Sequence, residues 1–123
     1  MFHLTVHTFF AAAHNLINYQ GDCENLHGHN WKVEVTVGAQ ELDKAGLGID
    51  FKILKSTLRT LLETLDHKHL NQVPPFDVIS PSSENIARFL FDRLSDQLNN
   101  ANIAVEKVNV WESDYACASY TRD

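Results

Sequence analysis

The sequence lacks the features that mark several classes of protein. None of its apolar runs approaches the roughly 20 residues that a membrane-spanning helix needs. The N-terminal stretch MFHLTVHTFF has no early basic residue of the kind found in signal peptides. Lysine and arginine number only 10 against 16 acidic residues, which gives a net charge of −6 and argues against a nucleic-acid surface. We therefore expect a cytoplasmic protein with neither a membrane nor a nucleic acid as its partner.

Cysteine is scarce, whereas histidine is abundant. The two thiols, Cys23 and Cys117, lie far apart in the sequence, and in a reducing compartment they are expected to be free. We expect Cys117 to be a buried or half-buried thiol. Seven histidines among 123 residues point to metal or proton chemistry. The 44% of hydrophobic residues support one compact domain over residues 1–123.

The spacing of apolar residues predicts four strands and two helices. Alternation of apolar and polar residues is typical of half-buried strands, and apolar residues recur at helical spacing after Asp50 and after the pair Ser82 and Ser83, which are suitable N-caps. The order ββααββ predicts an α+β sandwich, a four-stranded antiparallel sheet with two helices on one face. Exposed aliphatic residues on the other face and open sheet edges favour self-association. The expected strands cover residues 1–11, 27–38, 105–112 and 116–121.

The stretch CENLHGHNW places two imidazoles two positions apart on a predicted strand. His27 and His29 then point to the same side with Cα atoms about 6.5–7 Å apart, although two surface histidines would give the same pattern. If the first two strands pair antiparallel, His14 at the end of the first strand lies beside them. Three neutral imidazoles with an open fourth position are typical of a catalytic zinc site. We interpret His3 and His7, toward the far end of the first strand, as ordinary surface or core residues.

Cys23 lies four positions before His27, and this spacing leaves three roles open for the thiol. As a fourth zinc ligand it would close the site and make it structural. As a free thiolate near the cation it would be a base with a lowered pKa. It could also be a buried thiol without chemistry.

Two further acidic positions are candidates for the site. In LDHKHLN, Asp66 precedes His67, and a carboxylate beside an imidazole fixes its tautomer and raises its basicity. The alternative is a helix C-terminus, where the dipole favours histidine. Glu112 ends the third predicted strand, and its carboxylate could accept the paired N–H donors of a pterin or guanine in bidentate fashion.

Six motifs of the chain, in the same order, resemble the 6-pyruvoyl-tetrahydropterin synthase and 6-carboxy-tetrahydropterin synthase family over essentially the whole length: FFAAAH, CENLHGH, GLGIDF, LDHKHLN, SPSSENIARFLFDRL and VWES. The resemblance implies the T-fold, ββααββ, whose subunits close a barrel and form a hexamer of two trimers. It implies Zn2+ held by His14, His27 and His29, with Cys23 as a catalytic base and not a ligand.

The resemblance also assigns the remaining site residues. It implies that Asp66 and His67 form a catalytic pair contributed at a subunit interface, and that Glu112 anchors the pterin ring. Ser82 and Ser83 match a pair that helps to bind the pterin and is often threonine in the family. Two positions, Asn15 and His69, depart from the family pattern. A triphosphate must meet cations, and the candidates are Lys32, Lys68, Lys107 and Arg122.

The implied substrate is 7,8-dihydroneopterin triphosphate. The three residues between the cysteine and the first histidine of CENLHGH form a short spacing that resembles the bacterial 6-carboxy-tetrahydropterin synthases of queuosine biosynthesis. The implied products are 6-carboxy-5,6,7,8-tetrahydropterin, triphosphate and acetaldehyde. The alternatives are a 6-pyruvoyl-tetrahydropterin synthase, which only eliminates triphosphate, and a non-catalytic T-fold module that binds pterin or purine.

Overall fold

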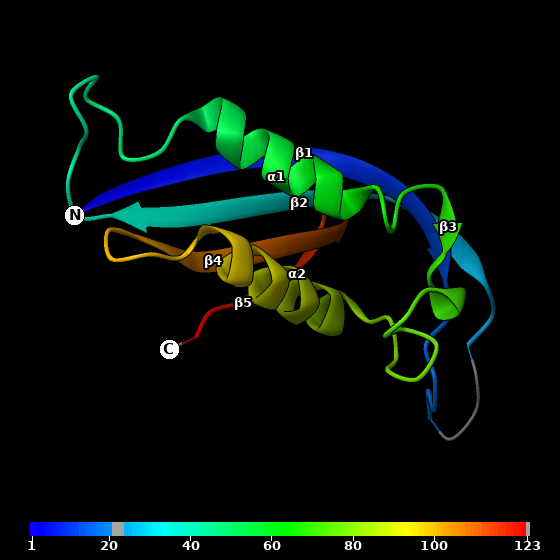
Figure 1. Cartoon of the computed structure of the whole chain (residues 1–123). Helices are drawn as coiled ribbons and strands as arrows, with labels where there is room; N and C mark the ends of the chain where they lie inside the picture. Colours follow the sequence, from blue (N-terminus) through cyan, green and yellow to red (C-terminus); the bar gives the residue numbers. More distant parts are fainter. Residues whose placement is uncertain (21–23, 123) are drawn as a thin grey trace.

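A five-stranded sheet, in the order β3-β1-β2-β4-β5, has both long helices on one face (Figure 1). The computed structural model describes residues 1–20 and 24–122. β1 pairs antiparallel with β2, β2 with β4, and β4 with β5. The elements are β1 (Phe2–His14), β2 (His27–Ala39), α1 (Phe51–Leu62), β3 (Lys68–His69), the 3-10 turn η1 (Leu70–Gln72), α2 (Ser83–Leu98), β4 (Ile103–Ser113) and β5 (Ala116–Tyr120).

The predicted α+β class and the order of the long elements are confirmed, but the strand count of four was wrong. β3 adds a fifth strand, which pairs parallel with β1 so that Ala12 lies opposite Lys68. A strand of two residues has no alternation that a sequence pattern could reveal. β1 also runs to His14 instead of ending near residue 11, because its last rungs are held by pairing with both neighbours.

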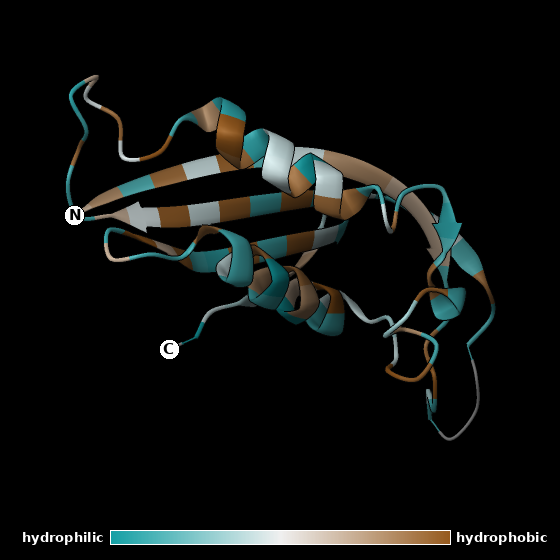
Figure 2. Cartoon of the chain, in the orientation of Figure 1, coloured by the Kyte–Doolittle hydropathy of each residue, from teal (hydrophilic) through white to brown (hydrophobic). Residues whose placement is uncertain are grey.

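The core lies between the sheet and the two helices. On β2 every second side chain from Trp31 to Val37 is fully buried, and Figure 2 shows the matching alternation of hydrophobic and hydrophilic bands along this strand. α1 and α2 each turn an apolar stripe toward this face. The buried helical residues include Leu54, Leu58, Leu61, Leu62, Ile86, Leu90, Phe91 and Leu94.

Both helices begin at the N-caps that the sequence indicates. The Asp50 carboxylate accepts a hydrogen bond from the backbone N–H of Lys52 at 2.8 Å, and the Ser82 hydroxyl accepts one from Asn85 at 3.1 Å. Each cap satisfies one of the backbone donors that a helix leaves unpaired in its first turn. The second cap also fixes the start of α2, where Ser83 follows.

The sheet face opposite the helices carries mainly polar residues together with the aromatic Phe9 and Trp111, so the expectation of exposed aliphatic residues there was wrong. Thr5 and Thr36 hydrogen-bond across β1 and β2 at 2.9 Å, and the indole Nε1–H of Trp111 donates to the Glu34 carboxylate at 2.6 Å. Period-2 alternation places one polar set on this face. Within the part of the chain that the structure describes, no helix has the length and apolar character needed to cross a bilayer.

The core ends at a tryptophan that contacts two of the three histidines, His14 and His29. Trp31 is fully buried and stacks on Phe10 with ring centroids 5.7 Å apart. The ring centroids of His14 and His29 lie 4.8 and 5.2 Å from that of Trp31, with the ring planes nearly perpendicular. Figure 1 shows this end of β1 and β2 extending beyond both helices, so the histidines lie where the apolar layer gives way to solvent.

Replacing Trp31 by alanine tests this placement. We expect Trp31→Ala to lower the free energy of unfolding by about 3–5 kcal/mol, the usual cost of removing a large buried aromatic side chain. Trp111→Ala is the matched control and should cost less, because that ring is only partly buried. Urea denaturation measures both values. Equal losses in the two variants would contradict the assignment of Trp31 to the core.

Candidate metal centre

Strand register brings the three predicted histidines to one place. His14 pairs directly with His27 across β1 and β2, and His29 lies opposite Ala12 two rungs further along. All three side chains lie on the helix-facing side of the sheet, because they share the alternation of Phe10 and Trp31. The juxtaposition expected from antiparallel pairing is therefore confirmed.

The tautomers of His14 and His27 are fixed by backbone carbonyls. The Nδ1 of His14 lies 2.8 Å from the Pro81 oxygen, and the Nδ1 of His27 lies 2.8 Å from the Asn25 oxygen. A carbonyl oxygen only accepts, so both Nδ1 atoms carry the proton and donate it. Each neutral ring then presents a bare lone pair at Nε2.

These two lone pairs face each other. The Nε2 atoms of His14 and His27 are 3.1 Å apart, and two acceptors at this distance repel. Only a cation between them, a proton or a metal ion, removes the repulsion. Ligating histidines commonly donate the other ring N–H to a carbonyl or carboxylate, as both rings do here.

His29 supplies a third nitrogen. Its Nε2 is buried and has no hydrogen-bond partner among the described residues, although it lies 2.9 Å from a carboxylate oxygen of Glu112. Burial lowers the pKa of His29, the neighbouring His14 and His27 lower it further, and the Glu112 carboxylate opposes the shift. A pKa below 6.5 leaves the His29 ring neutral near pH 7, so one of its nitrogens has a lone pair that a metal ion can bind.

The donor set fits a divalent ion. One ligand atom each from His14, His27, His29 and Glu112 lie within 4.8 Å of one another. Two nitrogens bound tetrahedrally at about 2.0–2.1 Å from zinc are about 3.3 Å apart, close to the 3.1 Å found between His14 and His27. Imidazole and carboxylate ligands suit zinc and related divalent ions. This group, named here the metal group, could therefore hold a metal ion.

Glu112 belongs to the metal group and also opens to a cavity. Its Oε1 lies 3.4 Å from the His14 Nε2, a proximity that could not be predicted from the spacing of the motifs. A cavity of about 400 Å³ next to it is lined by Glu112, Ser83, Cys117 and residues around them. Of the two predicted serines, Ser83 lines this cavity, whereas the hydroxyl of Ser82 caps α2.

Cys117 is exposed in the wall of this cavity. The expectation of a buried or half-buried thiol was wrong because Cys117 lies opposite Trp111, on the sheet face that the helices do not cover. The other thiol, Cys23, lies outside the described residues. Its neighbour Glu24 accepts a hydrogen bond from the Leu16 N–H at 3.2 Å and donates its own N–H to the Leu16 carbonyl at 3.1 Å.

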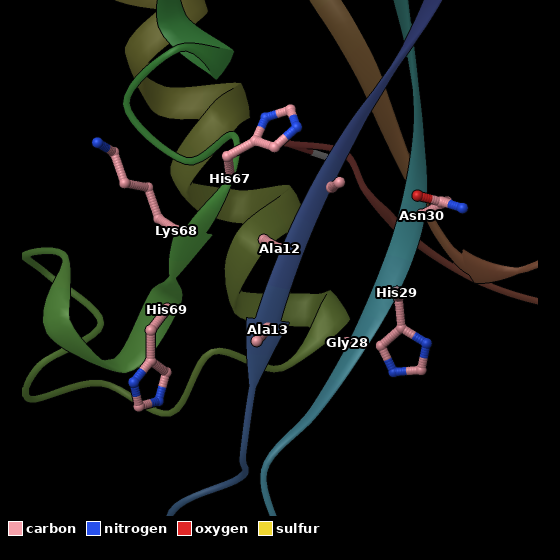
Figure 3. Close-up of a pocket in the computed structure, with 9 residues that line it drawn as sticks. Ala12, Ala13, Gly28, His29, Asn30, His67, Lys68 and His69 are labelled. Atoms are coloured by element: carbon pink, nitrogen blue, oxygen red, sulfur yellow. The ribbon is translucent and has the colours of Figure 1, made fainter.

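Asp66 and His67 form the expected pair, apart from the metal group. The His67 Nδ1 lies 3.0 Å from the Asp66 carboxylate, and the His67 side chain is 82% exposed. α1 ends at Leu62, so the helix-terminus interpretation of His67 is not supported. Figure 3 shows His67 and His29 on opposite sides of β1, and both line a cavity of about 570 Å³.

Backbone contacts hold this pair to the outer edge of β1. The Asp66 carboxylate accepts from the Ala11 N–H at 2.9 Å, and the His67 N–H donates to the Ala11 carbonyl at 2.6 Å. His67 has a left-handed φ of 57°, which is uncommon for a residue other than glycine. The Ala11 N–H is the main cause of the lowered pKa of Asp66, and His67 contributes to it.

The cations suggested for a triphosphate do not gather at one point. Lys68 lines the cavity of about 570 Å³ with His67 and His69. Lys32 lies 5.8 Å from the ring centroid of Trp111 on the polar face, and Arg122 lies over an aromatic ring of α2. Lys107 is exposed on β4.

Comparisons with known proteins agree with this geometry. The family model described as 6-pyruvoyl tetrahydropterin synthase matches residues 3–123. The 6-carboxy-5,6,7,8-tetrahydropterin synthase of Aquifex aeolicus is 30% identical over 82% of this chain and 76% of its own length. The 6-pyruvoyl tetrahydrobiopterin synthase of Drosophila melanogaster is 31% identical over 95% of this chain and 77% of its own length.

A solved structure matches almost the entire fold. The 6-pyruvoyl tetrahydropterin synthase of Caenorhabditis elegans superposes with a TM-score of 0.86 at 26% identity, covering 99% of this chain and 96% of that one. The two-helix, five-strand arrangement is thus the T-fold that these proteins share.

Removing one imidazole should weaken metal binding. We expect His14→Ala, His27→Ala and His29→Ala each to lower the affinity for Zn2+ by more than the roughly 10–100-fold that loss of an outer hydrogen-bond partner costs. Competition with a chromogenic chelator measures the affinity. His3→Ala is the control, because His3 pairs with Glu106 on the polar face. A harmless change at any of the three positions, or an equal loss in His3→Ala, would refute this donor set.

The pKa of Asp66 predicts a pH dependence of stability. A folded-state pKa below the ordinary 3.8 means that the carboxylate stabilises the fold above that pH, and that the contribution is lost as pH falls through the folded-state pKa. Carbon-detected NMR should give a titration midpoint below 3.8 for Asp66. The difference in unfolding free energy between wild type and Asp66→Asn should shrink as the pH falls below 3.8. A difference that does not vary with pH would contradict this assignment.

Proposed function

The chain belongs to the 6-pyruvoyl tetrahydropterin synthase family, and from this premise we propose that it is a zinc-dependent lyase acting on 7,8-dihydroneopterin triphosphate. The proposed products are 6-carboxy-5,6,7,8-tetrahydropterin, triphosphate and acetaldehyde, in the pathway to queuosine. The observation that carries the proposal is the pair of facing Nε2 lone pairs in the metal group, with His29 as a third neutral donor.

Two observations favour the carboxy product over the pyruvoyl product. The relative from Aquifex aeolicus is named for the carboxy reaction, and the spacing of CENLHGH is short. The relative from Drosophila melanogaster is named for the pyruvoyl reaction, so the elimination-only enzyme is the second candidate. The two differ in whether a carbon–carbon bond breaks after triphosphate leaves.

In this proposal His14, His27 and His29 hold the zinc ion. When bound, zinc supplies Lewis-acid chemistry that acidifies substrate hydroxyls and the adjacent C–H bonds. The Pro81 and Asn25 carbonyls keep His14 and His27 in the ligating tautomer. The role of the protein is thus to present neutral nitrogens in a fixed geometry before the ion arrives.

Glu112 and Ser83 are proposed to bind the pterin. The Glu112 side chain is 35% exposed and lies between the metal group and the cavity of about 400 Å³. A carboxylate there can accept two parallel N–H bonds from the amino group and ring nitrogen of a pterin. This position sets the ring in the cavity and directs its side chain toward the metal group. We assign Ser82 a supporting role through the α2 cap.

Cys23 is proposed as the base that removes a proton from the substrate, with His67, oriented by Asp66, as the partner acid or base. The 82% exposure of the His67 side chain favours service to the site of a neighbouring subunit. Among the described residues, β5 and the part of β1 before Ala11 each have one unpaired edge, and such edges can pair between copies. We therefore propose a homo-oligomer, a hexamer of two trimers, built from one T-fold domain spanning residues 1–123.

Product analysis tests the proposal. Zinc-loaded protein incubated with 7,8-dihydroneopterin triphosphate should release triphosphate and acetaldehyde in equal amounts, with 6-carboxytetrahydropterin identified by mass spectrometry. Triphosphate without acetaldehyde would support the pyruvoyl reaction instead.

A cysteine variant separates the enzyme from a binding module. Cys23→Ala should abolish turnover while zinc remains bound at the wild-type level. Saturable pterin binding by the wild type without triphosphate release would support a non-catalytic T-fold module. Loss of zinc from Cys23→Ala would mean that the thiol is a ligand, which contradicts the proposed role.

A further inference from the structure

Asn71, the last residue of LDHKHLN, hydrogen-bonds to both the backbone N–H and the backbone carbonyl of Asn15. Asn15 directly follows His14, a proposed metal ligand. The Asn71 Oδ1 accepts from the Asn15 N–H at 3.0 Å, and the Asn71 Nδ2 donates to the Asn15 carbonyl at 2.8 Å. This pair of bonds imitates one rung of a β-ladder, with a side-chain amide in place of a neighbouring strand. Asn71 lies in the turn η1, which directly follows β3.

These two hydrogen bonds, named here the Asn71 clamp, act at the point where strand pairing of β1 ends. On one side, pairing with β2 ends at the His14–His27 rung. On the other side, pairing with β3 ends at Ala13 and His69. Beyond that point the backbone would be free to pivot about His14. The Asn71 amide continues the support to Asn15.

The two departures from the family pattern contact each other in the same region. The Nε2 of His69 lies 3.4 Å from the Asn15 side-chain oxygen. Asn15 is thus contacted at its side chain by His69 and at its backbone by Asn71. The next residues are tied as well, because the Ile17 N–H donates to the Ser80 hydroxyl at 3.0 Å. The hydrogen bonds that hold Asn15 and Ile17 thus come from side chains, not from strand pairing.

We propose that Asn71 is a positioning residue for the metal group, an inference that rests on the metal binding in the proposed function. By fixing both peptide groups of Asn15, it fixes the backbone direction leaving His14 and therefore the aim of the His14 Nε2. Two contacts then set the orientation of the His14 ring. The Pro81 carbonyl holds its Nδ1, and the Asn71 clamp holds the backbone of Asn15 directly after it. Outer hydrogen-bond partners of this kind typically contribute about 10–100-fold to metal affinity.

The chain offers a matched control at the opposite end of the sheet. Asn102 makes the same type of clamp: its Oδ1 accepts from Gln40 and Glu41 at 3.0 and 2.7 Å, and its Nδ2 donates to the Glu41 carbonyl at 3.0 Å. Asn102→Leu removes an equivalent set of hydrogen bonds far from the metal group. A purely structural role of Asn71 would make the two leucine variants equivalent.

The test compares the two variants in the full chain. Zn2+ affinity is measured by chelator competition, the ligand geometry by the visible absorption of the Co2+-loaded protein, and the Asn15 backbone by amide hydrogen exchange without metal. Asn71→Leu should bind Zn2+ about 10–100-fold more weakly, with an altered Co2+ spectrum and faster exchange at Asn15. Asn102→Leu should match wild type in affinity and spectrum.

Asn71→Asp keeps the test decisive if the leucine variant fails to fold. The carboxylate still accepts from the Asn15 N–H but no longer donates to its carbonyl, so an affinity between those of wild type and Asn71→Leu is expected. Wild-type affinity in Asn71→Asp and Asn71→Leu, or equal losses in Asn71→Leu and Asn102→Leu, would overturn the inference while leaving the metal site intact. A wild type that binds no metal would overturn the metal site itself, and this inference with it.

Discussion

The structure depends on the contact between two imidazole nitrogens that both carry lone pairs. Backbone carbonyls accept hydrogen bonds from the Nδ1–H groups of His14 and His27, and the Nε2 atoms of the two rings lie 3.1 Å apart. A third nitrogen, on His29, is buried nearby without a hydrogen-bond partner among the described residues. Two acceptors that face each other in a partly buried site cost free energy. A bound cation removes that cost, and the relief of repulsion adds to the affinity of the site for the cation.

The fold builds this contact from both of its layers. Strand register places His14 opposite His27, and the buried Trp31 supports His14 and His29 from the core side. The start of α2 supplies the Pro81 carbonyl, while the segment after α1 runs along the outer edge of β1 from Ala11 to Asn15. That edge also holds the Asp66–His67 pair, so one short segment positions both a proton-transfer candidate and the backbone of a metal ligand.

Much of this arrangement could be predicted from the sequence, because alternation and spacing carry it. Alternation of apolar and polar residues predicts the long strands, and antiparallel pairing of the first two predicts that His14 lies beside His27 and His29. The tautomers could not be predicted, since the carbonyls of Pro81 and Asn25 leave no signature in a sequence. β3 could not be predicted, because a strand of two residues shows no alternation. The exposure of Cys117 was not predicted, because the sequence of the short strand β5 does not tell which of its faces the helices cover. Glu112 was expected at the ligand but not beside the histidines.

X-ray absorption spectroscopy of the zinc-loaded protein tests the central claim most directly. If three imidazoles hold the ion and the Cys23 sulfur is kept for chemistry, the first shell contains nitrogen and oxygen atoms only, with Zn–N distances of about 2.0–2.1 Å. A sulfur neighbour at about 2.3 Å would make Cys23 a ligand and close the site. That result, or a protein that retains no zinc to measure, would contradict the account.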